Sequence, residues 1–195
     1  MDNPLISNLT NHVLGSIKVK ERILNDDELL EKILEVVKLK IRILRSGNKI
    51  IFAGNGGSAA DSQHLAAEYV SKLKKEREPL AAIALTTDTS AITAISNDYD
   101  FKKLFSRQLK AISSKGDVFV GISTSGNSSN IIDAFEECKS LNLHSIGFFG
   151  QNSGLCSGKV DFELNIPSDF TAHIQEAHIM IGHIICSLVE DEIFF

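Results

Sequence analysis

Short apolar runs alternate with helical patterns along most of this chain, and this alternation restricts the fold more than any other feature. The runs cover residues 50–53, 81–85, 118–122, 144–149 and 162–165. Strands that alternate with helices in this way form a parallel sheet that is covered by helices on both faces. We therefore expect an α/β fold with a doubly wound parallel sheet.

Three further helical patterns lie at the ends of the chain and carry less chemical information. Residues 5–22 and 27–45 have apolar side chains at spacings of three and four, so we expect them to pack over the sheet or against another subunit. Residues 172–192 are strongly apolar, which is typical of a long helix buried on several sides. The second pattern has a broad apolar face, formed by Leu30, Ile33, Leu34, Val37, Ile41 and Leu44.

Length and charge limit the classes of function. A chain of 195 residues, of which 43% are hydrophobic, can bury one full core. We expect a single domain, with residues 1–46 as a helical extension and residues 47–195 as the α/β core. The net charge of -5 offers no broad basic surface, which argues against nucleic acid as the main partner.

Cysteine spacing and hydropathy predict a cytoplasmic protein. Cys138, Cys156 and Cys186 are odd in number and widely spaced, so they support neither a disulfide framework nor a cysteine zinc site. We see no signal peptide and no apolar run of membrane-spanning length, and we expect no membrane partner.

A hydroxyl-rich turn, here called the hydroxyl turn, covers residues 121–128 and reads Gly-Ile-Ser-Thr-Ser-Gly-Asn-Ser. Hydroxyl groups can donate hydrogen bonds to phosphate oxygens, and the helix that begins near Asn130 would direct free N–H groups at an anion. The turn has no lysine, so it suits one monophosphate better than a nucleoside triphosphate. An ordinary helix-capping loop has a similar composition, and that alternative stays open for this turn alone.

A second turn, here called the glycine turn, covers residues 54–58 and follows the first apolar run. A helical pattern from residue 59 to about residue 74 comes next. Gly54, Gly56 and Ala59 match a loose dinucleotide-binding pattern. The acidic residue expected about 20 positions further on is missing, so we expect no nucleotide cofactor. Both turns would open at the carboxyl edge of a parallel sheet, where they can form two walls of one cleft.

Ionisable side chains follow on two of the expected helices. His64 and Glu68 share one helix face near this cleft, and they could act as base and acid, form half of a metal site, or be a solvent-exposed pair. On the last helix, His178 is more typical of a hydrogen-bonded core residue. Gln175 and His183 lie about 12 Å apart along the helix axis and roughly 80° apart around it, so that convergence on one ligand requires long reaches.

Five motifs occur in a characteristic order: residues 54–58, residues 61–68, Asn97-Asp98, residues 123–128 and residues 174–183. Together they resemble the motifs of the sedoheptulose 7-phosphate isomerase family, also called phosphoheptose isomerases, which has the sugar-isomerase (SIS) fold. The resemblance covers nearly the whole chain. It implies a three-layer α/β domain, a homotetramer, and active sites shared between neighbouring subunits.

The resemblance also implies roles for individual residues. Glu68 and His183 would transfer protons, with Glu68 as base and His183 as acid, although the reverse order stays open. A zinc ion would be bound by His64, Glu68, Gln175 and His183. The phosphate would be held by Ser123, Thr124, Ser125 and Ser128, and the sugar would be lined by Asn55, Gly56, Gly57, Asn97, Asp98 and Gln175. One local departure is His173, at a position where relatives more often carry arginine.

The implied reaction converts D-sedoheptulose 7-phosphate to D-glycero-D-manno-heptose 7-phosphate through an enediol. It would supply nucleotide-activated heptose for a lipopolysaccharide core, a capsule or another surface glycan. An alternative from another class is a non-catalytic SIS tetramer that acts as a scaffold with a replication initiator. In that homologue the counterparts of Glu68 and His183 are replaced, whereas this chain keeps both. A sugar-phosphate sensor ranks lower, because the helices before the first strand do not suggest a DNA-binding domain.

Overall fold

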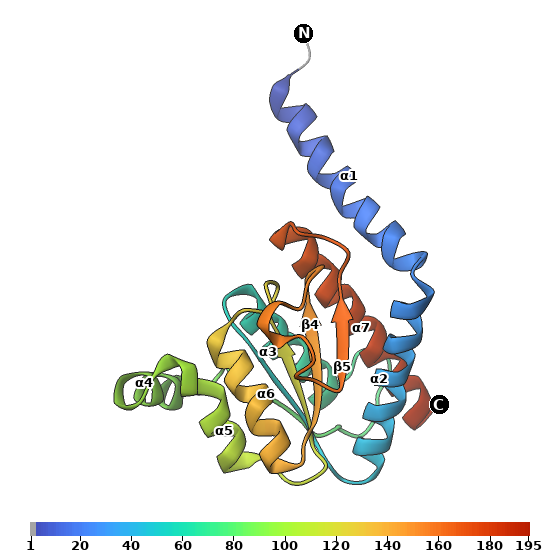
Figure 1. Ribbon diagram of the computed structural model, residues 1–195. Coiled ribbons are helices and arrows are strands. Elements are labelled where there is room, and N and C mark those ends of the chain that lie inside the picture. The colour runs from blue at the N-terminus through green and yellow to red at the C-terminus, as the bar shows by residue number, and fades with distance from the viewer. Residues whose placement is uncertain (1–2) are drawn as a thin grey trace.

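A five-stranded parallel sheet forms the centre of the molecule in the computed structural model, which describes residues 3–195 (Figure 1). The strand order is β2-β1-β3-β4-β5, and every neighbouring pair is parallel. All five expected strands are therefore confirmed. Their bounds are Ile50–Gly54 for β1, Ala82–Ala84 for β2, Val118–Ile122 for β3, His144–Phe149 for β4 and Phe162–Asn165 for β5.

Seven α-helices and two short 3-10 helices, η1 and η2, accompany the strands within the described residues. Two of the α-helices, α4 and α5, follow β2 and lie in a stretch where the sequence patterns indicated neither strand nor helix. The bounds are Pro4–Leu24 for α1, Asp27–Arg45 for α2, Gly57–Val70 for α3, Thr89–Asp98 for α4, Phe101–Lys103 for η1, Leu104–Ile112 for α5, Ser129–Leu141 for α6, Gly154–Cys156 for η2 and Thr171–Phe194 for α7.

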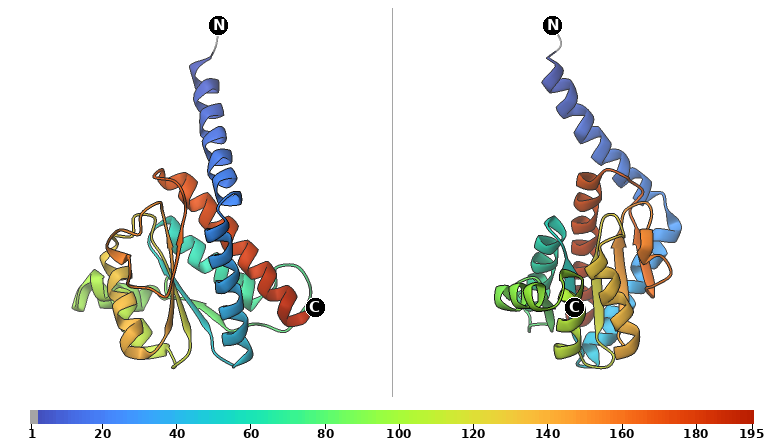
Figure 2. Two further views of the ribbon diagram at one scale, coloured as in Figure 1. Left: turned by 45° about the vertical axis from the view of Figure 1, so that its right-hand side comes forward. Right: turned by 60° about the vertical axis from the view of Figure 1, so that its left-hand side comes forward.

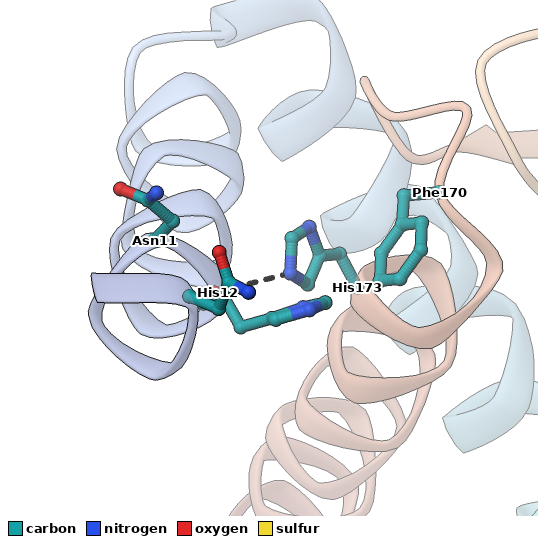
Figure 3. A pocket seen from close by; sticks show the side chains of 5 residues that line it. Asn11, His12, Phe170 and His173 are labelled. Atoms are coloured by element: carbon teal, nitrogen blue, oxygen red, sulfur yellow. Dashed lines mark hydrogen bonds between the residues drawn. The ribbon is translucent and has the colours of Figure 1, made fainter. Parts of the chain in front are cut away.

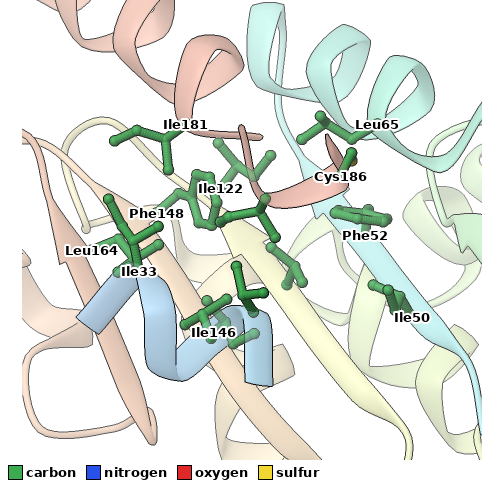
Figure 4. Packing of buried hydrophobic residues seen from close by; sticks show 14 of the residues in the cluster. Ile33, Ile50, Phe52, Leu65, Ile122, Ile146, Phe148, Leu164, Ile181 and Cys186 are labelled. Atoms are coloured by element: carbon green, nitrogen blue, oxygen red, sulfur yellow. The ribbon is translucent and has the colours of Figure 1, made fainter. Parts of the chain in front are cut away.

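The helices cover both faces of the sheet, so the expected three-layer arrangement is confirmed (Figure 2). Helices α2, α3 and α7 pack on the face that carries Ile50 and Phe52 of β1, and Figure 4 shows this cluster. Helices α5 and α6 pack on the opposite face, against Ile51 and Ala53. Because β1 is buried on both faces, its sequence is an unbroken apolar run rather than an alternating one.

Helix α1 packs on the surface of this body by its C-terminal end, and its N-terminal part extends well beyond the body (Figure 1). Only Val19 and Ile23 of this helix are buried. Leu34 of α2 is also 48% exposed, so the broad apolar face expected for this helix is not fully covered by the chain's own sheet. Large apolar side chains of α1 are also exposed: Leu24 at its end and six residues of its N-terminal part. The six are here called the α1 apolar face: Leu5, Ile6, Leu9, Val13, Leu14 and Ile17.

No helix within residues 3–195 combines the length and the apolar character needed to cross a bilayer. The strongly apolar helix α7 packs instead against α2 and α3, with Ile174, Ile181 and Ile185 in the core cluster. Its apolar sequence therefore reflects burial on several sides, as expected.

Lys40 is a charged side chain on the buried face of α2, where it is only 2% exposed. Its Nζ lies 3.5 Å from the hydroxyl oxygen of Tyr69 and 5.0 Å from the ring centroid of Phe52. Burial lowers the pKa of Lys40 from 10.5 to about 8. The ammonium group is thus surrounded by aromatic faces in the core, where its charge costs free energy at neutral pH.

Replacing Lys40 by methionine is expected to stabilise the fold by about 1 to 3 kcal/mol at neutral pH, because a buried charge is removed while the volume is kept. Below about pH 8 both folded and unfolded wild-type chains carry this proton, so the full cost applies. Between about pH 8 and 10.5 the unfolded chain binds more protons, so wild-type stability rises and the difference shrinks.

Urea unfolding of wild-type protein and Lys40→Met over this pH range, at one fixed protein concentration, measures the difference directly. A less stable Lys40→Met variant at neutral pH would contradict the prediction. It would mean that the contacts with Phe52 and Tyr69 outweigh the cost of burying the charge.

Candidate active site

The two turns singled out in the sequence lie next to each other at the carboxyl edge of the sheet. From β1 the chain crosses to β2 on one side and then returns to β3 on the other side of β1, so the strand order reverses between β1 and β3. The glycine turn follows β1 and the hydroxyl turn follows β3. Open parallel sheets bind ligands at such a reversal.

A pair of amides joins the two turns. Asn55 Nδ2 donates to Asn130 Oδ1 at 2.9 Å, and Asn130 Nδ2 donates back to Asn55 Oδ1 at 2.8 Å. Asn130 is fully buried in the first turn of α6. Because each amide uses one donor and one acceptor in this pair, the second donor of Asn55 stays free to bind another group. The distance between the turns is therefore set by two side-chain hydrogen bonds.

The hydroxyl turn is closed by its own hydrogen bonds and by a close backbone contact. Ser123 Oγ lies 3.1 Å from Ser128 Oγ, and the N–H of Gly126 donates to the carbonyl of Ser123 at 3.1 Å. Ser128 makes no side-chain capping bond to α6 within the described part of the chain. The positive end of α6 thus faces the turn, as an anion site requires.

A polar cavity of about 290 Å³ lies beside this turn. Thr124 and Ser125 of the hydroxyl turn line it, together with residues of the loops after β4 and β5 and of the start of α7. The remaining lining residues are Asn127, Gln151, Asn152, Gly154, Ser168, Asp169, Thr171 and Ile174.

Helices α3 and α7 bring three ionisable side chains together. His64 Nε2 lies 2.8 Å from His183 Nε2 and 3.3 Å from Glu68 Oε1. One ligand atom from each of the three lies within 4.8 Å of the others, which is a grouping that can hold a metal ion. His64 is exposed, whereas Glu68 and His183 are partly buried. His183 reaches the other two because α3 packs directly against α7.

Close packing of small residues makes this approach possible. A Cβ added to Gly182 would lie 2.6 Å from Leu65 Cδ2, and one added to Gly57 would lie 2.5 Å from Gln175 Nε2. Gly182 and Leu65 are the immediate neighbours of His183 and His64 in sequence. Gln175 therefore lies against the glycine turn, while His183 lies further along α7 beside His64.

Asn97 and Asp98 occupy a different place in the fold. They form the last residues of α4, where Asn97 Nδ2 donates to Asp98 Oδ1 at 2.7 Å and both are exposed. Helix α4 lies at the outer edge of the molecule, next to α5 (Figure 1). Their side chains are thus hydrogen-bonded to each other at the surface of this chain.

The core role predicted for His178 fits the structure. It is 1% exposed, and its Nε2 lies 3.0 Å from the carbonyl oxygen of Phe149. Burial lowers the pKa of His178 to about 4, so it is neutral at physiological pH.

Asp61 and Asn130 are the residues of this region to which sequence reasoning assigned no role. Asp61 Oδ2 is buried and has no hydrogen-bond partner among residues 3–195. Burial raises the pKa of Asp61, while the charges of His64 and His183 oppose that shift. Asp61 precedes His64 by three residues and Glu68 by seven, so helical spacing puts it on their face and was the available signal. For Asn130, only its hydrogen bonds to Asn55 on another loop reveal its importance.

His173, the local departure from its relatives, lies against the middle of α1 rather than in the histidine and glutamate cluster. Its Nε2 donates to the carbonyl oxygen of His12 at 3.2 Å, and its ring packs against Phe170 (Figure 3). These rings line a cavity of about 290 Å³ together with Asn8 and Asn11. The side chain thus anchors α1 to α7.

Comparisons with known proteins place these motifs in context. The family model described as "SIS domain" matches residues 17–150. The chain is 53% identical over 186 residues to the phosphoheptose isomerase of Aneurinibacillus thermoaerophilus, covering 95% of this chain and 94% of that protein. It is 51% identical over 194 residues to phosphoheptose isomerase 2 of Campylobacter jejuni, covering 100% and 96%.

Solved structures give the same result. The phosphoheptose isomerase GmhA from Neisseria gonorrhoeae superimposes with a TM-score of 0.90 at 41% identity, covering 96% of this chain and 99% of that one. A phosphoheptose isomerase from Francisella tularensis superimposes with a TM-score of 0.92 at 34% identity, covering 95% and 98%.

The backbone of the hydroxyl turn is expected to tolerate no side chain at Gly126. Its φ is 65°, and an added Cβ would lie 1.9 Å from the carbonyl oxygen of Ser153. Gly126→Ala should therefore cost the strain of a left-handed residue and a backbone clash, which together amount to roughly 2 to 5 kcal/mol of unfolding free energy.

Gly158 provides a matched control, because its φ is 69° but an added Cβ would meet nothing within 4 Å. Gly158→Ala should cost only the conformational strain, about 1 to 2 kcal/mol. Urea unfolding of both variants measures the difference. Equal losses of stability in the two variants would show that the contact between Gly126 and Ser153 does not constrain the turn.

Proposed function

The chain belongs to the SIS-domain family and, within it, to the phosphoheptose isomerases, and we propose that it converts D-sedoheptulose 7-phosphate to D-glycero-D-manno-heptose 7-phosphate. The protein is accordingly an aldose-ketose isomerase of sugar phosphates, acting in heptose biosynthesis. The observation that carries the proposal is the meeting of Glu68, His64 and His183 where α3 packs on α7, the two helices that also bring Gly57 and Gln175 together.

The reaction moves a proton between two adjacent carbons, so it requires a base, an acid and a group that stabilises the developing oxyanion. We assign Glu68 as the base and His183 as the acid. Glu68 is partly buried, which limits its contact with water, and His64 lies within 3.3 Å of its carboxylate. His183 on α7 has a ring nitrogen within 4.8 Å of the Glu68 carboxylate. Glu68 and His183 can therefore act on neighbouring atoms of one substrate.

The same cluster fits a divalent metal ion. Two imidazole nitrogens and one carboxylate within 4.8 Å form a donor set that zinc prefers, and the unpartnered buried Oδ2 of Asp61 adds negative potential nearby. We infer that His64, Glu68 and His183 hold zinc, with Gln175 as a further ligand. When bound, the ion would polarise the carbonyl and hydroxyl oxygens of the sugar.

The hydroxyl turn supplies the phosphate site in this proposal. The hydroxyl groups of Ser123, Thr124, Ser125 and Ser128, together with the N-terminus of α6, would bind the phosphate. The Asn55–Asn130 pair holds the glycine turn beside the hydroxyl turn. The sugar would therefore lie between the phosphate and the proton-transfer groups, where it would be lined by Asn55, Gly56, Gly57 and Gln175.

We further propose a homotetramer with shared active sites. The α1 apolar face exposes six large side chains on a helix that extends beyond the body of the chain, and apolar surface of this kind is typical of subunit interfaces. Sharing would also give a role to Asn97 and Asp98, which are exposed at the outer edge of their own subunit. We propose that this pair contacts the sugar at a neighbouring subunit's site.

Two broader features belong to the same proposal. We infer a single domain over the whole chain, because α1 and α2 contribute Val19, Ile23 and Ile33 to the core cluster of the α/β body. We also infer a cytoplasmic location, where Cys138, Cys156 and Cys186, all free and buried, would remain reduced.

Phosphorus and proton NMR of purified protein with sedoheptulose 7-phosphate in D2O tests the function. Samples stripped of metal and then loaded with zinc would be compared. We expect aldoheptose 7-phosphate to appear, with deuterium incorporated next to the carbonyl carbon, and we expect the zinc-loaded sample to be the faster. A folded tetramer with no turnover in either sample would contradict the proposal and favour the scaffold alternative.

Glu68→Gln is expected to lower kcat by about 10²- to 10⁴-fold, because glutamine keeps the shape of the side chain but cannot accept the proton. Glu76→Gln is the control, since Glu76 is an exposed carboxylate paired with Lys72 away from the cluster. It should keep wild-type turnover. Near-normal turnover of Glu68→Gln would exclude Glu68 as the base.

Leu9→Glu is expected to break the tetramer into smaller species, because it adds a charge to the centre of the α1 apolar face. Leu155→Glu is the control: Leu155 is exposed to a similar extent, 66% against 65% for Leu9, but lies in η2. Sedimentation velocity gives the mass of each species. A tetrameric Leu9→Glu protein, or an altered mass of Leu155→Glu alone, would place the interface elsewhere.

A further inference from the structure

A buried ion pair joins the segment after α3 to the end of α7. Arg77 Nε donates to Glu190 Oε2 at 2.9 Å, and the side chains are only 2% and 1% exposed. No motif in the sequence singles out either residue, and neither belongs to the proton-transfer cluster. The pair nevertheless lies between the two helices that carry Glu68 and His183.

Glu190 also accepts hydrogen bonds from three successive backbone N–H groups. Leu73 donates to Oε2 at 3.0 Å, and Lys74 and Lys75 donate to Oε1 at 2.9 and 3.2 Å. Burial raises the pKa of Glu190, but these bonds and Arg77 outweigh it and lower the pKa to about 2. The carboxylate is thus ionised under all ordinary conditions and holds this segment on α7.

Arg77 directs its other donors at the last turn of α3. Its Nη2 donates to the backbone carbonyl of Glu68 at 2.7 Å, and its Nη1 donates to the carbonyl of Tyr69 at 2.8 Å. The last carbonyls of a helix have no partner within the helix, so Arg77 supplies one for Glu68. The Tyr69 carbonyl also accepts from the N–H of Leu80 at 3.0 Å. The contact explains why α3 ends at Val70 rather than near residue 74 as its sequence pattern predicted, since the N–H groups that would continue it bond to Glu190.

The position of the pair relates it to both proton-transfer residues. On α3, Arg77 binds the main chain of Glu68 itself. On α7, Glu190 follows His183 by seven residues, which puts the two on the same helix face about 10 Å apart. Between α3 and α7, next to His183, Gly182 packs against Leu65. The two helices are therefore fixed to each other at two points, one beside the cluster and one at the ends of α3 and α7.

We propose that Arg77, held by Glu190, is a positioning residue that sets the distance and orientation of Glu68 relative to His183. A buried ion pair contributes little net stability compared with an apolar contact of the same size, so its geometry is the more important property. The planar guanidinium binds Glu190 and two carbonyls of α3 at once, which an ammonium group cannot do. This inference rests on the proposed isomerase function.

Arg77→Lys is the test variant, because it keeps the charge beside Glu190 and loses the fork that binds Glu68 and Tyr69. We expect kcat to fall by about 10- to 100-fold, with KM changed less than about threefold, since a small displacement of a reacting group mainly affects the chemical step. Asp191→Asn is the matched control. Asp191 pairs with Lys74 at 2.7 Å, so it joins the same two segments, but its side chain is 43% exposed and its partner lies outside α3.

Thermal unfolding distinguishes positioning from simple stabilisation. Arg77→Lys could lower the unfolding temperature and still have wild-type kcat when kcat is measured well below that temperature. In that case the pair is merely structural and the proposal is wrong. Asp191→Asn should keep wild-type kcat, and an equal loss of kcat in this control would also overturn it. Glu190→Gln, which leaves Arg77 in place without its charged partner, gives a second, independent variant if Arg77→Lys does not fold.

Hydrogen exchange measured by mass spectrometry separates this proposal from the proposed function. Arg77→Lys should increase exchange in the α3 peptide that contains residues 64–70, whereas Asp191→Asn should not. This result is independent of any substrate. Wild-type protein without isomerase activity would refute the function alone, whereas unchanged exchange in residues 64–70 together with unchanged kcat would refute the positioning role alone.

Discussion

The packing of α3 on α7 is the contact on which the rest of the site depends. Gly182 has no side chain, so Leu65 fits directly against the α7 backbone, and the neighbouring residues His183 and His64 come within 2.8 Å. An ordinary side chain at position 182 would push the helices apart and separate the ligand atoms that now lie within 4.8 Å. The chemistry of the cluster thus rests on an apolar contact in which the deciding feature is a missing Cβ.

Buried polar groups supplement this contact where apolar packing alone does not specify position. The reciprocal amides of Asn55 and Asn130 hold the glycine and hydroxyl turns together, and the Arg77–Glu190 pair holds the end of α3 to α7. Hydrogen bonds have directions, whereas apolar contacts do not, so such groups can fix a distance and an orientation in the core. Lys40 differs from them, because its pKa is lowered by burial and the charge is costly there.

Much of the fold was predictable from local patterns. Each of the five strands is a short apolar run, and the residues of β1 and β3 are buried on both faces, which is why the pattern was clear. Helices α4 and α5 were missed. Helix α4 has no buried residue, so no strong apolar periodicity marks it. The end of α3 was placed too late because the groups that stop it, Arg77 and Glu190, lie outside the helix and far apart in sequence.

Local sequence patterns are enough to predict the parallel sheet, the two turns at its carboxyl edge and the helical spacing of His64 and Glu68, because each depends on residues that are close together in the chain. The sequence also contains the motifs by which the family is recognised. By contrast, three contacts follow from long-range packing alone: His183 meets His64, Asn130 binds Asn55, and Arg77 reaches the main chain of Glu68. The first two depend on residues that are 119 and 75 positions apart. Distances of that kind follow from how helices and loops pack, and no local periodicity encodes them.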